Sequence, residues 1–479
     1  MITMLGHPRR RDGSTRRETL KVGALSLLGG AFNLPSLLAA EENRAVSLPA
    51  GCAADVLPAK AKSVILLYLL GGAATQDMFD LKPEAPEKIR GEFKPIASNV
   101  AGMELCEHLP LMSRWMHKAA LVRTVNHKAG CHNPLPSYTG YEIALADITS
   151  TKDTYPPSMG SVCEYLRDER DDLPAYVYLP NFAGAGNGAT GVVRYPGPYA
   201  GFLGKRYDPL FSEFDKTVVR DLDKTKVLGG VPFLAGNSTL AEGITLDSFQ
   251  AREGLLQQFN RQQRSLEAKG SLGDLHRTQQ RAISLLTSSK LKAAFDLAGV
   301  DAGLLDRYGR TLFGSSSLIA RRLVQAGVRF VNVTWEYPAD NSWDTHANNF
   351  GWLRGALPAL DATYSALLQD LEHNHLLDET LVVLMSDMGR TPQVNANAGR
   401  DHWSYCYSVL FAGAGIRGGT VCGESDAHAA YVKSRPVSTS DICATIYQCL
   451  GIDPQMPIYD NGRPIPVAHG GKPIREILA

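Results

Sequence analysis

The sequence predicts a three-layer α/β/α fold built on a mostly parallel β-sheet. Two observations support this prediction: apolar runs of strand length recur along the chain, and patterns typical of amphipathic helices lie between them. A parallel sheet covered by helices on both faces buries its strands on both sides, so its strands are continuously apolar. A chain of 479 residues is long enough for one large domain of this kind or for two smaller ones.

The strands and helices can be placed in order along the chain. The first strand is predicted at residues 62–72, where KSVILLYLLGG is a continuous apolar run that ends in a Gly pair. Runs of the same kind predict further strands at residues 118–125, 175–180, 328–335, 380–387 and 407–415. Helical periodicity predicts helices at residues 314–326, 352–371 and 440–450. Strands that alternate with helices in this way favour one doubly covered sheet.

The segment from about residue 211 to residue 308 has a different character. The stretches REGLLQQFNRQQRSLEAKG and LHRTQQRAISLLTSSKLKAAFDL are amphipathic and helix-rich, and no strand-like run occurs between them. We therefore predict a helical insertion or cap on the α/β body at residues 211–308.

Residues 1–40 have the pattern of a twin-arginine export signal. Arg16 and Arg17 precede a weakly apolar, glycine-containing stretch at residues 22–40. The alternative is a basic arm followed by a short helix. The stretch is too rich in glycine for a membrane anchor. We expect the twin-arginine translocase to export the chain, and we expect residues 41–479 to be periplasmic or secreted, without stable membrane insertion after cleavage.

Composition excludes several classes of partner. The 49 basic and 49 acidic residues balance to a net charge of zero, which gives no electrostatic reason to expect binding to nucleic acid or to an anionic membrane. A hydrophobic content of 44% is ordinary for a soluble globular protein. The eight cysteines show no CxxC spacing, so they predict neither a zinc ribbon nor a disulfide framework.

Several acidic and histidine residues lie where ligands bind in such sheets, just beyond the carboxyl ends of the predicted strands. Those that we predict as metal ligands are Asp77, Asp344, His346, Asp387 and His402. Carboxylate and imidazole together suit zinc, manganese or iron, and added carbonyls and waters would also admit calcium or magnesium. Taken singly, such an Asp caps a helix or forms a turn, and such a His is a loop residue with satisfied hydrogen bonds. The metal hypothesis requires that these residues converge.

Four further residues are candidates for catalysis. Cys131 can be a nucleophile, a ligand or a small buried residue, and His132 follows it directly. Arg390 and Arg400 are suited to holding an oxyanion with two parallel hydrogen bonds. The alternative for both arginines is an ion pair with Asp387 or Asp401.

Five segments resemble a known family. In chain order they are GGAATQDMFDLKPEAPEKIRGEFKPI, CEHLPLMSRWMHKAALVRTVNH, SWDTHANNF, GRTPQVNANAGRDHW and RPVSTSDICATIYQCLGIDP. They look like the secreted bacterial family known as domain of unknown function 1501, which is placed in the alkaline phosphatase and sulfatase superfamily. The resemblance implies an alkaline phosphatase-like fold and a divalent metal, with zinc, calcium or manganese as the candidates.

The resemblance also implies roles for individual residues. The segment MSDMG resembles the Ser-Asp-Asn-Gly segment of sulfatases, which makes Asp387 a metal-ligand candidate with a methionine in place of the second ligand. Asp344 and His346 resemble the Asp/His metal pair of the phosphatases at a shorter spacing, and His402 resembles their last His ligand. Cys131 lies at the place of the formylglycine-forming cysteine, but the Cys-x-Pro-x-Arg pattern does not follow it.

The sequence is compatible with two functions. The chain is either an exported metal-dependent hydrolase of phosphate or sulfate esters, on a small-molecule or polysaccharide substrate, or a catalytically inactive sulfatase-like envelope protein with a binding or assembly role. A cytoplasmic phosphate-transfer enzyme is disfavoured by the export signal.

Overall fold

A computed structural model describes residues 59–130, 132–145, 151–167, 173–181, 196–215, 227, 229–234, 288–335 and 343–479. These residues belong to one compact unit, Val56–Ala479. Two predictions lie outside the described residues: the export signal at residues 1–40 and the role of Cys131.

The strands of the main sheet are β1 Ser63–Leu69, β4 Ala119–Asn126, β5 Tyr176–Leu179, β6 Leu210–Glu213, β7 Phe233–Leu234, β8 Phe330–Trp335, β9 Thr380–Ser386, β12 Tyr407–Gly413, β13 Thr420–Cys422 and β16 Val437–Ser438. Their order is β13-β4-β12-β9-β1-β8-β5-β6-β7, and β16 pairs with β4 outside this path. Four separate pairs are β2 Pro95–Ala97 with β3 Glu104–Cys106, β10 Gly389–Arg390 with β11 His402–Trp403, β14 Glu424–Ser425 with β15 Val432–Ser434, and β17 Pro457–Asp460 with β18 Arg463–Pro466.

The α-helices are α3 Gln76–Phe79, α4 Glu87–Arg90, α5 Leu135–Thr139, α6 Met159–Tyr165, α9 Ser289–Phe295, α10 Ala302–Arg307, α11 Leu312–Ala326, α12 Asn349–His373 and α13 Thr439–Cys449. The 3-10 helices are η1 Met112–Lys118, η2 Gly201–Leu203, η3 Lys205–Tyr207 and η6 Arg475–Ile477. Within the described part of the chain, none of the helices has the length and apolar character that a membrane crossing requires.

The structure confirms the predicted α/β fold class. Each predicted apolar run contains a strand of the main sheet, namely β1, β4, β5, β8, β9 and β12, and the three predicted helices are α11, α12 and α13. Strand β1 is parallel to β8 and β9, and β5 is parallel to β8 and β6. Strand β12 is antiparallel to both of its neighbours, β4 and β9. The sheet is therefore mostly parallel with an antiparallel strand inside it.

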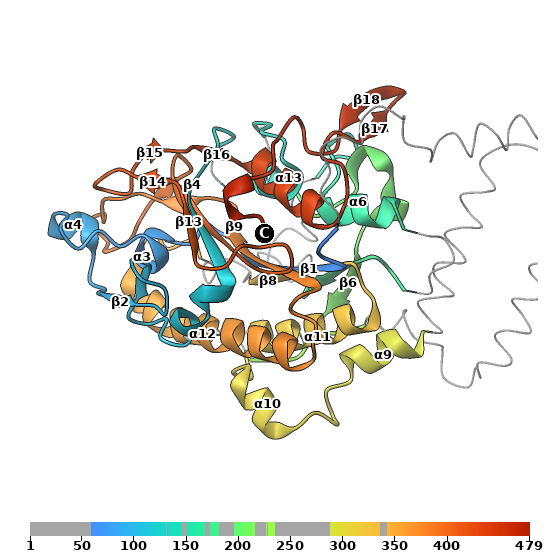
Figure 1. Ribbon diagram of the computed structural model, residues 1–479, viewed down its shortest axis with the longest axis horizontal. Coiled ribbons are helices and arrows are strands. Elements are labelled where there is room, and N and C mark those ends of the chain that lie inside the picture. The colour runs from blue at the N-terminus through green and yellow to red at the C-terminus, as the bar shows by residue number, and fades with distance from the viewer. Residues whose placement is uncertain are drawn as a thin grey trace, which may run out of the picture. The chain divides into compact units, whose positions relative to one another are not determined.

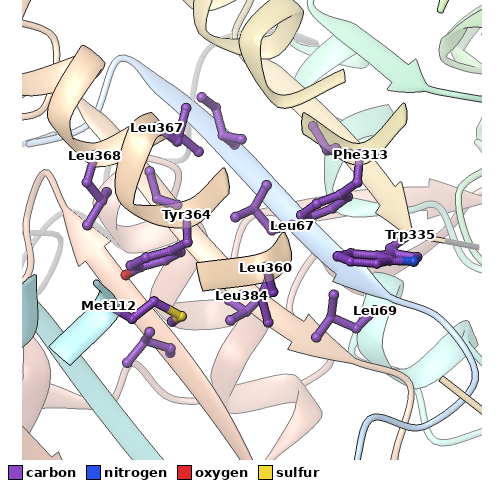
Figure 2. Packing of buried hydrophobic residues seen from close by; sticks show 14 of the residues in the cluster. Leu67, Leu69, Met112, Phe313, Trp335, Leu360, Tyr364, Leu367, Leu368 and Leu384 are labelled. Atoms are coloured by element: carbon purple, nitrogen blue, oxygen red, sulfur yellow. The ribbon is translucent and has the colours of Figure 1, made fainter. Parts of the chain in front are cut away.

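Helices cover both faces of the sheet, with α11 and α12 on one side and α13 and α6 on the other (Figure 1). On the first face Leu67 and Leu69 of β1 pack in one apolar cluster with Leu360 of α12 (Figure 2). On the second face Leu66 and Tyr68 pack in another cluster with residues of α13. Because successive strand residues point to opposite faces, a strand buried on both sides must be apolar at every position. This explains the continuous run at the first strand.

The predicted helical insertion needs a correction at its start. Strand β6 falls within the segment expected to contain no strands, where it pairs with β5 in the main sheet, and β7 pairs with β6. Both strands are short and only partly buried, so they lack the long apolar run that signals a buried strand. At the other end of the segment α9 and α10 are helical, and residues 216–226, 228 and 235–287 lie outside the described residues.

The topology determines where a site can form. Strands β1, β8 and β9 are mutually parallel, and β4 points the same way because β12 is antiparallel to both β9 and β4. The carboxyl ends of these four strands therefore lie at one edge of the sheet, where α/β proteins bind their ligands.

Candidate metal centre

Four side chains bring metal-binding atoms together at this edge of the sheet. They are His132, Asp344, His346 and His402, and one donor atom from each lies within 4.8 Å of the others. All four side chains are partly buried. His132 follows β4, Asp344 and His346 follow β8, and His402 begins β11, so three separate segments contribute. We call these four residues the His-Asp cluster.

The carboxylate of Asp344 is the meeting point of the His-Asp cluster. Its Oδ2 lies 3.1 Å from Nε2 of His132, and its Oδ1 lies 3.1 Å from Nε2 of His346 and 3.1 Å from Nε2 of His402. The Nε2 atoms of His346 and His402 are 2.8 Å apart. All three imidazoles thus present the same ring nitrogen to one carboxylate.

This geometry fits a divalent cation with four ligands. Bonds of about 2.0–2.2 Å place neighbouring ligand atoms of a tetrahedral site about 3.3 Å apart. The nitrogen–oxygen and nitrogen–nitrogen distances in the cluster, 3.1 and 2.8 Å, are close to that separation. Three nitrogens and one carboxylate oxygen form a donor set that suits zinc.

Residues behind His346 orient its ring. Nδ1 of His346 is 2.8 Å from Oδ1 of Asp401. The side-chain amide of Asn395 donates to the same Asp401 oxygen at 3.1 Å and to the backbone oxygen of His346 at 2.9 Å. A carboxylate at Nδ1 keeps the proton there and leaves the Nε2 lone pair directed into the cluster. The sequence suggested Asp401 only as an ion-pair partner for the arginines and assigned no role to Asn395.

The charges in the cluster shift its protonation equilibria. Burial disfavours ionised Asp344, but hydrogen bonds from His132 and His402 and the charge of Arg390 outweigh it and hold the pKa of this carboxyl well below its usual range. Burial also disfavours protonated His132, yet its hydrogen bond with Asp344 and the negative charge of Asp387 raise the pKa of His132. For His402 burial dominates and lowers the pKa. The cluster thus pairs a permanent carboxylate with one histidine that favours the charged form and one that favours the neutral form.

His132, predicted from the sequence to be catalytic, lies among the donor atoms. Its φ of 50° places it in the left-handed region, which is unfavourable by about 1–2 kcal/mol for a residue other than glycine. Backbone strain of this kind is concentrated at functional sites. This backbone conformation brings its Nε2 within 3.1 Å of Oδ2 of Asp344.

Asp387, predicted as a metal ligand, is not one of the four converging residues. Its Oδ1 accepts the backbone N–H groups of Gly71 at 3.0 Å and Gly72 at 2.8 Å. Its backbone oxygen lies 2.9 Å from Nε2 of His127. Its Oδ2 is buried without a hydrogen-bond partner among the residues described. The Gly pair that follows β1 holds this carboxylate beside the cluster, where its negative charge raises the pKa of His132.

Arg390, predicted to bind an oxyanion, is engaged inside the protein. It is fully buried, and its Nη2 donates to Asp344 and to the backbone oxygen of Gly71. Nε donates to the backbone oxygen of Gly72 at 2.7 Å, and Nη1 donates to that of Arg400 at 3.1 Å. The guanidinium therefore ties the end of β1 to the cluster and presents no two-pronged face to a substrate.

Asp77, predicted as a metal ligand, and Arg400, predicted to hold an oxyanion, form an ion pair with each other. Nε and Nη2 of Arg400 donate to the two carboxylate oxygens of Asp77 at 2.8 and 2.6 Å. The other N–H groups of Arg400 donate to backbone oxygens, and Nδ2 of Asn349 donates to Asp77 at 2.9 Å. Both members of the pair are almost fully buried. The oxygens of Asp77 are thus committed to Arg400 and Asn349, and Arg400 has no N–H group left for a substrate.

Comparison with known proteins classifies the chain. A sequence model of the family described as "Protein of unknown function (DUF1501)" matches residues 61–478. Among curated proteins there is no match.

Solved structures give weaker likenesses. The lipoteichoic acid synthase LtaP from Listeria monocytogenes is 11% identical with a TM-score of 0.37, over 91% of this chain and 81% of that chain. The PsFucS1 sulfatase from Pseudoalteromonas sp. is 12% identical with a TM-score of 0.37, over 86% and 73%. A protein in the alkaline phosphatase superfamily from Vibrio parahaemolyticus is 10% identical with a TM-score of 0.36, over 88% and 72%. Scores this low say nothing about activity.

Proposed function

Because the chain belongs to the DUF1501 family, which is described only as proteins of unknown function, we propose its function from the His-Asp cluster. The cluster is the divalent-metal centre of an exported hydrolase that cleaves phosphate or sulfate esters. One observation carries the proposal: donor atoms from four side chains on three segments lie within 4.8 Å of one another. Titratable groups with shifted pKa values at the ligand-binding edge of an α/β sheet are typical of active sites.

The donor set narrows the choice of metal. Calcium and magnesium prefer oxygen ligands, whereas three imidazoles and one carboxylate favour zinc, with manganese or iron as the next candidates. Catalytic zinc sites commonly have three protein ligands and one open position. Asp344, His346 and His402 supply such a set, because Nε2 of each histidine lies 3.1 Å from Oδ1 of Asp344. His132 faces the other oxygen, Oδ2, and in this arrangement lies beside the open position and is not a ligand.

Each residue in and around the cluster has its own role in ester hydrolysis. A divalent cation bound there supplies Lewis-acid chemistry to the ester and to water. Asp401 keeps the His346 ring in the orientation that presents Nε2, and Arg390 fixes the Asp344 carboxylate. His132, whose pKa is raised, carries a proton for the leaving oxygen. This role for His132 is the catalytic role that the sequence predicts.

One observation favours the second candidate function, an inactive envelope protein with a binding or assembly role. Both arginines predicted to hold the oxyanion are committed to internal partners, Arg390 to Asp344 and Arg400 to Asp77. A hydrolase of this kind must then stabilise the anionic substrate through the cation and His132. A metal centre without hydrolysis would have a structural or binding role.

Export is part of the same proposal. Arg16 and Arg17 with the apolar stretch after them direct the chain to the twin-arginine translocase. Replacing both by Lys should keep the protein in the cytoplasm, as cell fractionation and immunoblotting would show. Secretion at the wild-type level would contradict this part of the proposal.

Metal analysis tests the site directly. Wild type purified from the exported fraction should hold close to one zinc per chain by elemental analysis. His402→Ala removes one of the three proposed ligands and should lose the metal, whereas His132→Gln leaves Asp344, His346 and His402 in place and should keep it. His373→Ala replaces an exposed histidine at the end of α12 and serves as the matched control. Equal metal content in wild type and His402→Ala would disprove the metal centre.

A screen of phosphate and sulfate esters with these variants separates the two functions. If the chain is a hydrolase, wild type cleaves at least one ester, and both His402→Ala and His132→Gln lose that activity by about 100-fold or more. Metal binding without any hydrolysis would favour the inactive envelope protein.

A further inference from the structure

Three aromatic side chains form a patch on the surface next to β11. Trp403, Tyr405 and Tyr431 have ring centroids 5.0 Å apart between Trp403 and Tyr405, 5.4 Å apart between Trp403 and Tyr431, and 6.0 Å apart between the two tyrosines. Tyr405 is 46% exposed and Tyr431 is 54% exposed. We call these three residues the aromatic patch. Exposed aromatic groups that gather in this way mark interaction sites more often than single exposed residues do.

The aromatic patch is held in place by hydrogen bonds beneath it. Nε1 of Trp403 donates to the backbone oxygen of Ala430 at 2.6 Å. The polar atom of the indole therefore has a hydrogen-bond partner, and its carbon atoms contact the tyrosines. The carboxylate of Asp426 accepts the backbone N–H groups of Ala430 at 2.8 Å and of Tyr431 at 3.2 Å. These contacts fix the turn between β14 and β15 that presents Tyr431. A surface ordered before binding loses little conformational entropy when a ligand arrives.

One residue of the aromatic patch, Trp403, lies on the same short strand as His402 of the metal centre. His402 and Trp403 are consecutive residues of β11, where they pair with Arg390 and Gly389 of β10. Consecutive strand residues point to opposite faces, so Trp403 points away from the face on which His402 joins the His-Asp cluster, and the patch is not part of the cluster. A ligand that touches both must extend around the strand and is therefore longer than a single small ester.

The exposed area limits what can bind. Two half-exposed tyrosines offer roughly 200 Å² together, against about 800 Å² per partner in a stable protein–protein interface. The planes of the two tyrosine rings are inclined by 44° to each other, so together they do not form a flat surface. No hydrogen-bond partner for either tyrosine hydroxyl is found among the described residues. A sugar ring has one C–H face that packs on aromatic carbon and a rim of hydroxyls that these phenols can bond.

We propose that the aromatic patch binds a sugar unit of a polysaccharide chain. In combination with the proposed function, on which this further step rests, the substrate is a phosphate or sulfate ester carried by a polysaccharide. The unit that bears the ester lies at the His-Asp cluster, and another unit of the same chain packs on Tyr405 and Tyr431. Saccharide binding by the patch needs no hydrolysis and can be tested separately.

Affinity electrophoresis of the full chain tests the binding. Native gels contain dextran, dextran sulfate, chondroitin sulfate or alginate, and retardation of the band gives a dissociation constant for each. We expect at least one of these polysaccharides to retard wild type. Tyr405→Ala and Tyr431→Ala should each weaken that binding about five- to tenfold, and the double variant should migrate as it does without polysaccharide.

Two controls make the outcome decisive. Tyr459→Ala removes a tyrosine that is 56% exposed on β17, away from β11, and should be retarded like wild type. His402→Ala should lose metal yet keep retardation, so failure of the metal centre and failure of the patch are distinguishable. The proposal is overturned if none of the polysaccharides retards wild type, or if the double tyrosine variant is retarded like wild type.

Discussion

Asp344 illustrates how much depends on a single side chain in this site. Three imidazole nitrogens lie 3.1 Å from its oxygens, and Arg390 donates to the same carboxylate. The sequence predicted Asp344 and His346 as ligands because they follow the end of a buried strand, and His402 because it lies in the polar loop before the next one. The structure pairs Asp77 with Arg400, since a buried charge needs an opposite charge beside it, and the sequence does not reveal that the two are within reach of each other.

The pairing of His132 with Asp344 predicts a pH dependence of stability. The pKa of His132 in the folded protein is raised because, although burial opposes it, the hydrogen bond with Asp344 and the charge of Asp387 favour the protonated form. A raised folded-state pKa contributes stability that is fully present below the unfolded pKa and is lost as the pH rises through the folded pKa. In metal-free protein, the free energy of unfolding of wild type relative to that of His132→Gln should be larger at low pH and should decrease as the pH rises through the folded-state pKa of His132.

Urea unfolding with a chelator, between about pH 6 and pH 9, measures that difference. The exposed His373→Ala should show no such trend. A difference between wild type and His132→Gln that grows with pH would contradict the assignment of the raised pKa.

At the scale of elements, the β10–β11 pair connects the metal centre to the end of β1. His402 is opposite Arg390 in this pair, and Arg390 donates to the backbone oxygens of Gly71 and Gly72. The loop between β10 and β11 also carries Arg400, whose buried pair with Asp77 fastens the loop to α3. A two-residue strand is too short to be predicted from periodicity, so the sequence predicted His402 as a ligand without the strand pair that carries it.

The Asp77–Arg400 pair should contribute strongly to stability. In Asp77→Asn the charge of Arg400 stays buried without a counter-charge, which should lower the free energy of unfolding by about 3–5 kcal/mol. Glu424→Gln disrupts the exposed ion pair with Lys433 and should lower it by less than about 1 kcal/mol. Urea unfolding measures the free energy of unfolding of both variants and of wild type. If both substitutions lower it by the same small amount, the buried pair does not anchor the loop.

At the scale of the whole molecule, two apolar clusters on opposite faces of the sheet stabilise the fold. Strand β1 contributes alternate residues to both clusters, and its neighbours β8 and β9 lie on either side of it. Continuous apolar runs are the signal of such strands, which is why β1, β4, β5, β8, β9 and β12 were predictable. The strands β6 and β7 were missed because they are short and partly exposed at the end of the sheet.

Removing a side chain from the centre of the sheet should destabilise the whole domain. Leu67 is completely buried in β1 and packs among the residues in Figure 2, so Leu67→Ala should lower the free energy of unfolding by about 2–5 kcal/mol through lost contacts and a cavity. Leu111 is 39% exposed, and Leu111→Ala should change it by no more than about 0.5 kcal/mol. Denaturant unfolding measures both, and similar effects of the two substitutions would contradict this account of the core.

The sequence by itself determined the fold class and the edge of the sheet at which to look for a site. It could do so because burial on both faces requires apolar strands and because parallel strands end at a common edge. Only the tertiary structure decided that His132 joins Asp344, His346 and His402, that Asp387 is held by the Gly pair, and that Asp77 neutralises Arg400. Those outcomes depend on which side chains meet when segments far apart in the chain come together. The periodicity of apolar residues indicates which positions are buried, but it does not indicate where a polar side chain points or which group it contacts.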